Sequence, residues 1–70
     1  MTAIRNVNTT IANRIAAGET LYIVYRTCEG DNWYWGAWEN LSGAFSAAVD
    51  IGGAVEVSTS VHILDTNPWA

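Results

Sequence analysis

Few side chains in this sequence are suited to nucleophilic or acid–base chemistry. The chain has one cysteine, Cys28, and one histidine, His62, which together could form a nucleophile and its base. No sequence signature supports that pairing, and we expect Cys28 to lie inertly at the end of a strand and His62 on a solvated strand face. A metal site needs three or four converging ligands, which these two residues do not provide. We therefore predict no catalytic residues, no metal site, no cofactor and a protein that is not an enzyme.

The charge of the chain indicates the class of partner. Seven acidic residues are set against three basic ones, all of them arginine, and the net charge is −4. Binding to nucleic acid requires several cations to displace phosphate counterions, and an acidic field repels phosphate. No stretch approaches the roughly 18 apolar residues of a membrane span. We predict a protein partner with a basic surface, no direct binding to nucleic acid and no membrane partner.

Length and cysteine content bound the organisation of the chain. Seventy residues, half of them hydrophobic, predict one small domain over 1–70. A core of this size leaves a thin margin of stability, so a partner or a second copy in a homodimer could contribute to it. A single cysteine allows no internal disulfide, and the first 20 residues lack the apolar run of a signal peptide. The expected location is the cytoplasm, or the host-cell cytoplasm if the protein is phage-encoded.

The sequence predicts a β-hairpin over residues 20–38. Residues 20–27 are rich in β-branched and aromatic side chains, residues 28–32 form a polar turn with a glycine, and residues 33–38 return as a second strand. Strand alternation predicts Trp33 and Trp35 on one face and Tyr34 and Trp38 on the other.

Two further segments have apolar side chains at helical spacing. The first predicts a helix over 3–17, capped by Thr2 and ending at Gly18, although its asparagines and threonines leave a strand as the alternative. The second predicts a helix over 41–51 with Asn40 as its N-cap, and a strand is again the alternative. The faces expected to pack inward carry Ile4, Val7, Ile11 and Ile15 in the first helix, and Leu41, Ala44, Phe45, Ala48 and Val49 in the second.

The last segment completes the predicted fold. Residues 54–64 alternate between apolar and polar side chains, which is typical of a half-buried antiparallel strand. The expected fold is α+β, with two short helices on one face of a three-stranded antiparallel sheet in the order α-β-β-α-β. If neither helix forms, the alternative is an all-β meander.

The hairpin carries the candidate binding surface, because most of the tryptophans and tyrosines lie in it. If the helices cover one face of the sheet, aromatic side chains on the other stay exposed or pack against another molecule. The structural alternative is that they fill the core and pair across strands. The predicted partner-binding residues are Trp33, Tyr34, Trp35, Trp38, Tyr22, Glu29, Asp31 and Glu39.

Three functions are compatible with such a surface. The first is a protein-binding inhibitor or adaptor, steered by its acidity toward a basic groove; phage-encoded inhibitors of bacterial defence, such as anti-CRISPR proteins, are analogous in size and charge. The second rests on residues 29–38, which locally resemble a segment of fucose-binding propeller lectins. In those lectins an acidic-Gly turn precedes a Trp-Tyr-x-Gly-Ala strand, but the repeated blades are missing here. The resemblance implies that Trp33 and Trp38 stack on sugar rings while Glu29 or Asp31 accepts from hydroxyls. The third is a structural subunit that self-assembles through its aromatic face.

Overall fold

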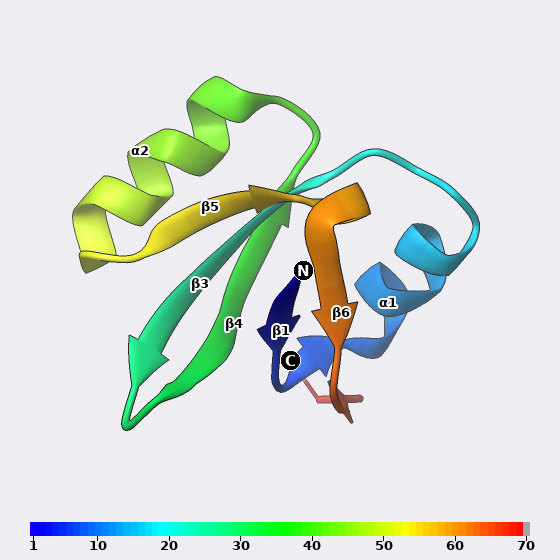
Figure 1. The fold of residues 1–70 in the computed structure, drawn as a ribbon. Helices are drawn as coiled ribbons and strands as arrows, with labels where there is room; N and C mark the ends of the chain where they lie inside the picture. Colours follow the sequence, from blue (N-terminus) through cyan, green and yellow to red (C-terminus); the bar gives the residue numbers. More distant parts are fainter. Residues whose placement is uncertain (70) are drawn as a thin grey trace.

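The computed structural model describes residues 1–69, which form a small α+β fold (Figure 1). Its centre is a three-stranded antiparallel sheet in the order β4-β3-β5, accompanied by two helices and two short parallel strand pairs, β1 with β6 and β2 with β7. The α+β class is therefore confirmed. The elements are β1 (Thr2–Ile4), β2 (Val7–Asn8), α1 (Thr9–Ala16), β3 (Tyr22–Cys28), β4 (Asp31–Trp38), α2 (Leu41–Ile51), β5 (Ala54–Val57), the 3-10 turn η1 (Ser58–Ser60), β6 (Val61–Ile63) and β7 (Thr66–Asn67).

The predicted hairpin is confirmed, with a tighter turn than expected. Cys28 pairs with Asp31, so the loop contains only Glu29 and Gly30. Both have positive φ, 52° and 84°, which is the backbone of a type I′ turn and matches the twist of the two strands.

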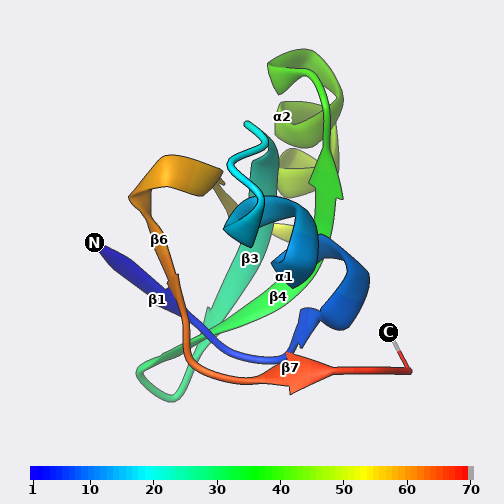
Figure 2. The same cartoon turned by 90° about the vertical axis from the view of Figure 1, so that its right-hand side faces the viewer.

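The helix predicted over 3–17 is wrong in its first half. Residues 2–4 and 7–8 are strands that pair in parallel with β6 and β7, and α1 begins only at Thr9 (Figure 2). Asn6, with φ of 65°, breaks any helix between them. The cap is Asn8 rather than Thr2, because its Oδ1 accepts from the amides of Thr10 and Ile11 at 2.8 and 3.4 Å.

The single strand predicted over 54–64 is divided by η1, and Ser58 is the reason. This residue is buried, and its hydroxyl accepts from the amide of Leu21 at 2.9 Å and donates to the carbonyl of Glu19 at 3.0 Å. Its own amide donates to the Leu21 carbonyl at 2.8 Å. These bonds hold the chain just before β3 and turn the backbone away from the sheet, so β6 leaves to pair with β1 (Figure 1).

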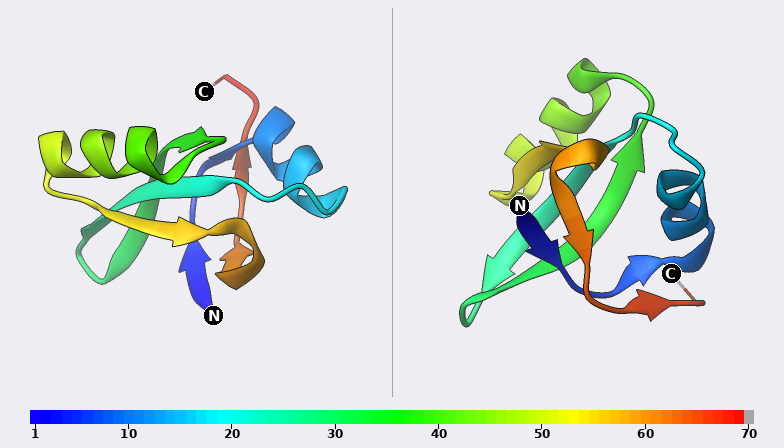
Figure 3. Two further views of the ribbon diagram at one scale, coloured as in Figure 1. Left: turned by 90° about the horizontal axis from the view of Figure 1, so that it is seen from above. Right: turned by 45° about the vertical axis from the view of Figure 1, so that its right-hand side comes forward.

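The prediction that both helices cover the same face of the sheet is wrong. Ile23 packs with Ile4, Val61 and the apolar side of α1, whereas its neighbour Val24 packs with the alanines of α2. Consecutive strand residues point to opposite faces. Consequently α2 covers one face, and β1, β6 and α1 cover the other (Figure 3). The N-terminal segment can supply this second layer because it is split into strands and a short helix.

Arg5 joins that second layer to the sheet through its backbone. Its amide donates to the Asn32 carbonyl at 2.8 Å, and its carbonyl accepts from the Tyr34 amide at 2.9 Å. The outer edge of β4 near the hairpin turn is therefore paired, and the sheet curls toward β1 and β6.

Candidate binding surface

The hairpin exposes two tryptophans. Trp33 and Trp35 are 42% and 58% exposed. Trp33 pairs across the strands with Arg26, and together with Thr27 and Cys28 these residues line an open depression of about 430 Å³. Arg26 lies two residues beyond Val24 on β3, so by alternation the Arg26–Trp33 pair is on the α2 side of the sheet.

Arg26 differs from the other two arginines. Arg5 forms an ion pair with Asp31 at 3.1 Å and a longer one with Asp65 at 3.8 Å, and Arg14 pairs with two glutamates. Within residues 1–69, Arg26 is the one arginine with no carboxylate partner. Arg26 is exposed and pairs across the strands with exposed Trp33. It could not be selected from the sequence, because an isolated arginine in a strand carries no signal of its partners.

A β-bulge changes which aromatic residues share a face. Val24 pairs with Gly36 but Tyr25 pairs with Tyr34, which leaves Trp35 as an extra residue in β4. Tyr34 therefore packs against the cluster around Ile23, and Trp38 against the cluster around Val24. Alternation alone had put Tyr34 and Trp38 on the same face, because a one-residue bulge reverses the count beyond it.

Three of the predicted binding residues pack largely within the fold. Tyr22 and Trp38 are cross-strand partners that lie half-buried under α2, and Tyr34 is half-buried on the opposite face. Burial raises the pKa of the Tyr34 hydroxyl above its ordinary value, because the charged phenolate is poorly solvated there. Of the aromatic candidates, the structure brings only Trp33 and Trp35 prominently to the surface within the described chain.

The three candidate carboxylates are not one acidic cluster. Glu29 is exposed in the hairpin turn, Asp31 accepts from Arg5, and Glu39 accepts from Arg14 at the far end of β4. Glu39 is separated from the other two by strand geometry, since the eight residues of β4 span roughly 25 Å.

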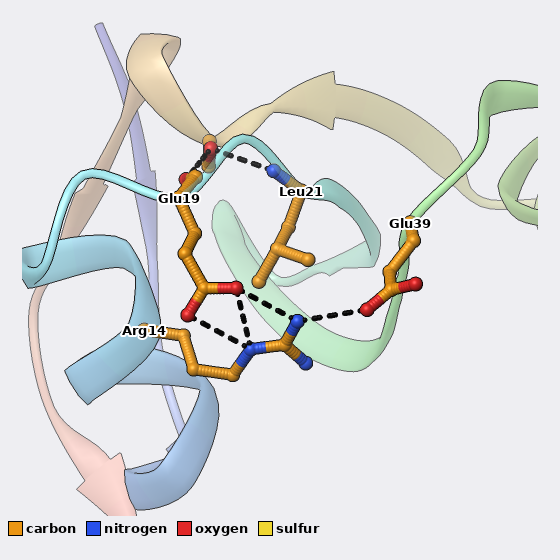
Figure 4. A network of polar contacts seen from close by, with 5 residues as sticks. Arg14, Glu19, Leu21 and Glu39 are labelled. Atoms are coloured by element: carbon orange, nitrogen blue, oxygen red, sulfur yellow. Dashed lines mark hydrogen bonds and ion pairs between the residues drawn. The ribbon is translucent and has the colours of Figure 1, made fainter.

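Arg14 organises a second polar network, away from the hairpin turn. It donates to Glu19 through Nε and Nη2 at 2.9–3.2 Å and to Glu39 through Nη2 at 3.0 Å (Figure 4). The hydrogen bonds from Arg14 lower the pKa of the Glu19 carboxyl, and the same bonds raise the pKa of Arg14. The network links the end of α1 to the end of β4 and occupies Glu39.

The predicted inner face of the helix over 41–51 is wrong for its three large side chains. The helix spans 41–51 as predicted, with Asn40 accepting from the Gly43 amide at 3.0 Å and Gly52 left-handed at φ 65°. Only the small members of the expected inner face, Ala44 and Ala48, are buried. Leu41, Phe45 and Val49 point outward and are more than half exposed. Helical spacing could not decide which part of a wide apolar face meets the sheet.

Cys28 and His62 show no shared site. Cys28 is exposed at the end of β3, as predicted, and His62 is exposed on β6. Over residues 1–69 there is no group of three histidine, cysteine or acidic side chains placed to hold a metal ion. In the same residues no helix is long and apolar enough to cross a membrane.

Comparison of the chain with protein-family models, with curated proteins and with solved structures found no match. The exposed surface of the protein is therefore the basis for assigning a function.

Proposed function

We propose that this protein is a non-enzymatic inhibitor or adaptor that binds a protein partner through its hairpin. The observation that carries the proposal is the exposure of Trp33 beside Arg26, around an open depression that both residues line; Trp35, two residues further along β4, is also exposed. Tryptophan and arginine are the residue types that most often dominate binding energy at protein interfaces. Monomeric surfaces rarely leave such residues together without a partner.

Charge supports a partner with a basic surface. The chain carries a net charge of −4, and Glu29 at the hairpin tip is exposed. Such a field speeds association with a basic surface and disfavours acidic ones. Arg26 lines the depression and forms no ion pair within residues 1–69, so it is available to a carboxylate of the partner. An inhibitor that occupies the basic groove of a nucleic-acid-binding protein, in the manner of small phage-encoded inhibitors, has these properties; a cytoplasmic setting belongs to the same proposal.

Matched tryptophan variants test the proposal. The partner is captured from an extract of the native host, purified, and titrated calorimetrically with each variant. Trp33→Ala should weaken binding at least tenfold, since loss of a hot spot costs about 2 kcal/mol or more. Trp69→Ala removes a tryptophan outside the hairpin that is even more exposed, at 92%, and should leave affinity unchanged. Equal affinities of the two variants would exclude the hairpin as the binding surface.

Two further measurements separate the proposal from its alternatives. His62→Ala, which lies on β6 outside the depression, should bind as the wild type does, and loss of activity in this variant would favour a catalytic role. Carbohydrate binding has weaker support, because Trp38 packs under α2 and Asp31 is held by Arg5, which leaves Trp33 and Glu29 of the implied sugar-binding set. Glycan-array binding that Trp33→Ala abolishes would replace the protein partner with a sugar.

A further inference from the structure

The outward side of α2 is apolar where a solvent-facing helix is usually polar. Leu41, Phe45 and Val49 are 54%, 62% and 65% exposed and follow one another at intervals of four residues. We call these three residues the outer stripe. Their neighbours Ser42 and Ser46 are exposed, small and uncharged, so nothing bulky borders the stripe on that side. An amphipathic helix normally buries its large apolar side chains, and α2 buries alanines instead.

The outer stripe is symmetric along the helix. Phe45 is its centre, with Leu41 four residues before it and Val49 four residues after it. If two copies pack their α2 helices antiparallel about a two-fold axis, Phe45 meets Phe45 of the second copy and Leu41 meets Val49 of the second copy. A two-fold interface uses the same patch on both subunits. Rows of side chains four residues apart are also the ridges that interlock in the commonest class of helix packing.

The charges of α2 favour the same arrangement. The helix has no acidic residue in its first turn and no basic residue in its last turn, where Asp50 is exposed instead. A carboxylate is unfavourable at the negative end of its own helix and favourable at the positive end of another. Antiparallel pairing moves Asp50 beside the N-terminus of α2 in the second copy. The acidic residue nearest that end, Glu39, is already paired with Arg14 at 3.0 Å.

The exposed area sets the strength of the association. The exposed parts of the three side chains come to on the order of 350 Å² in each copy, given that large side chains bury ~150–250 Å² in full. Two copies would bury about 700 Å² through the stripe, less than the ~1,200 Å² of stable complexes. The expected association is therefore weak and depends on concentration.

We propose that α2 mediates a weak symmetric dimer of this chain through Leu41, Phe45 and Val49. The outer stripe has no charged side chain that could select a foreign partner, and its symmetric spacing is complementary to the same stripe on a second copy. The dimer surface lies on α2 and the proposed partner surface lies on the hairpin, so each can be removed without the other.

Sedimentation equilibrium tests the dimer with single variants at exposed positions. From about 10 µM to about 1 mM, the range of weak association, the mean mass of the wild type should rise from 7.6 kDa toward twice that value. Phe45→Gln keeps a good helix former and should stay monomeric over the whole range. Trp33→Ala should dimerise as the wild type does. A wild type that stays monomeric at the highest concentration, or a Phe45→Gln variant that dimerises normally, overturns the proposal.

Asp50→Asn tests the antiparallel orientation, because the two states respond in opposite directions. Removing the charge should raise the thermal midpoint of the dilute monomer, since the carboxylate opposes its own helix dipole. The same variant should weaken dimerisation two- to fivefold. Tighter dimerisation of Asp50→Asn would overturn the antiparallel arrangement, because it would mean that the carboxylates repel across the interface.

Discussion

The indole of Trp38 lies across Gly36 so closely that a Cβ added at Gly36 would be 2.8 Å from both Cη2 and Cζ3 of the ring. Gly43 of α2 also contacts this ring, because a Cβ added at Gly43 would lie 3.0 Å from Trp38 Cδ1. The two glycines thus leave room for a tryptophan between strand and helix. This packing explains why α2 approaches the sheet through glycine and alanine and turns its larger side chains outward.

Gly36→Ala should destabilise the fold by about 1–3 kcal/mol, because either the Trp38 ring or the strand must move to make room for the added methyl group. Chemical unfolding monitored by circular dichroism measures the loss. Combining Gly36→Ala with Trp38→Leu removes the large ring, so the double variant should lose less than the sum of the two single losses. Strict additivity would show that Gly36 and Trp38 are not coupled.

Ser58→Ala should cost about 1–3 kcal/mol of stability, because the amide of Leu21 is left buried without its acceptor. Thr59→Ala, at the exposed neighbouring position in η1, is the matched control and should change stability little. Urea unfolding of the two variants compares the costs. Similar losses in both would mean that Ser58 does not hold the segment before β3.

Acid should remove the contribution of the Arg14–Glu19 pair. The pKa of Glu19 is lowered in the folded state, so its contribution is complete above the unfolded value of about 4.3 and is lost as pH falls through the lowered folded pKa. Glu19→Gln should therefore reduce stability at neutral pH and flatten its decline below about pH 4.3. Thermal midpoints across this range test the prediction, which fails if the two proteins decline in parallel.

Alkali should act through Tyr34. Burial raises its folded pKa, so the unfolded chain loses the phenolic proton first, and the stability linked to this residue falls as pH rises above the ordinary tyrosine value of about 10. Tyr34→Phe should lessen the decline in that range and leave stability at neutral pH close to that of the wild type. Tyr25 pairs with Tyr34 across the strands, so Tyr25→Phe is the control variant, and its stability is measured over the same pH range. An unchanged alkaline decline in Tyr34→Phe would assign the effect elsewhere.

The hairpin and α2 could be predicted from the sequence, because residues close together in the chain determine both elements. The hairpin followed from its β-branched and aromatic strands, and α2 from Asn40, Gly52 and the spacing between them. The N-terminal segment could not be predicted in the same way. Ile4 and Val7 fit a helical stripe, but their partners lie near the other end of the sequence, in β6 and β7. Tertiary pairing outweighed a weak helix signal there.

The candidate surface was predicted only in part for the same reason. The exposure of Trp33 and Trp35 follows from the number of aromatic side chains in the hairpin. The bulge at Trp35 depends on the backbone pairing of the two strands, which the alternation of side chains along one strand does not reveal. The pairing of Asp31 with Arg5 joins residues 26 positions apart, so sequence spacing gave no sign that this carboxylate is occupied. Phe45 faces outward because Trp38 fills the space between the sheet and α2. That packing involves Gly36 and Gly43, which lie in different elements.

The parallel pairs of β1 with β6 and β2 with β7 have a consequence for the order of folding. Residues 2–8 find their partners at 61–67, nearly the whole sequence away, while the hairpin and α2 close over short distances. Contacts of such long sequence separation form slowly and late. During synthesis on the ribosome, β1 and β2 must therefore wait unpaired until 61–67 emerge, and in that interval the apolar side chains of Ile4 and Val7 are open to aggregation or to chaperones.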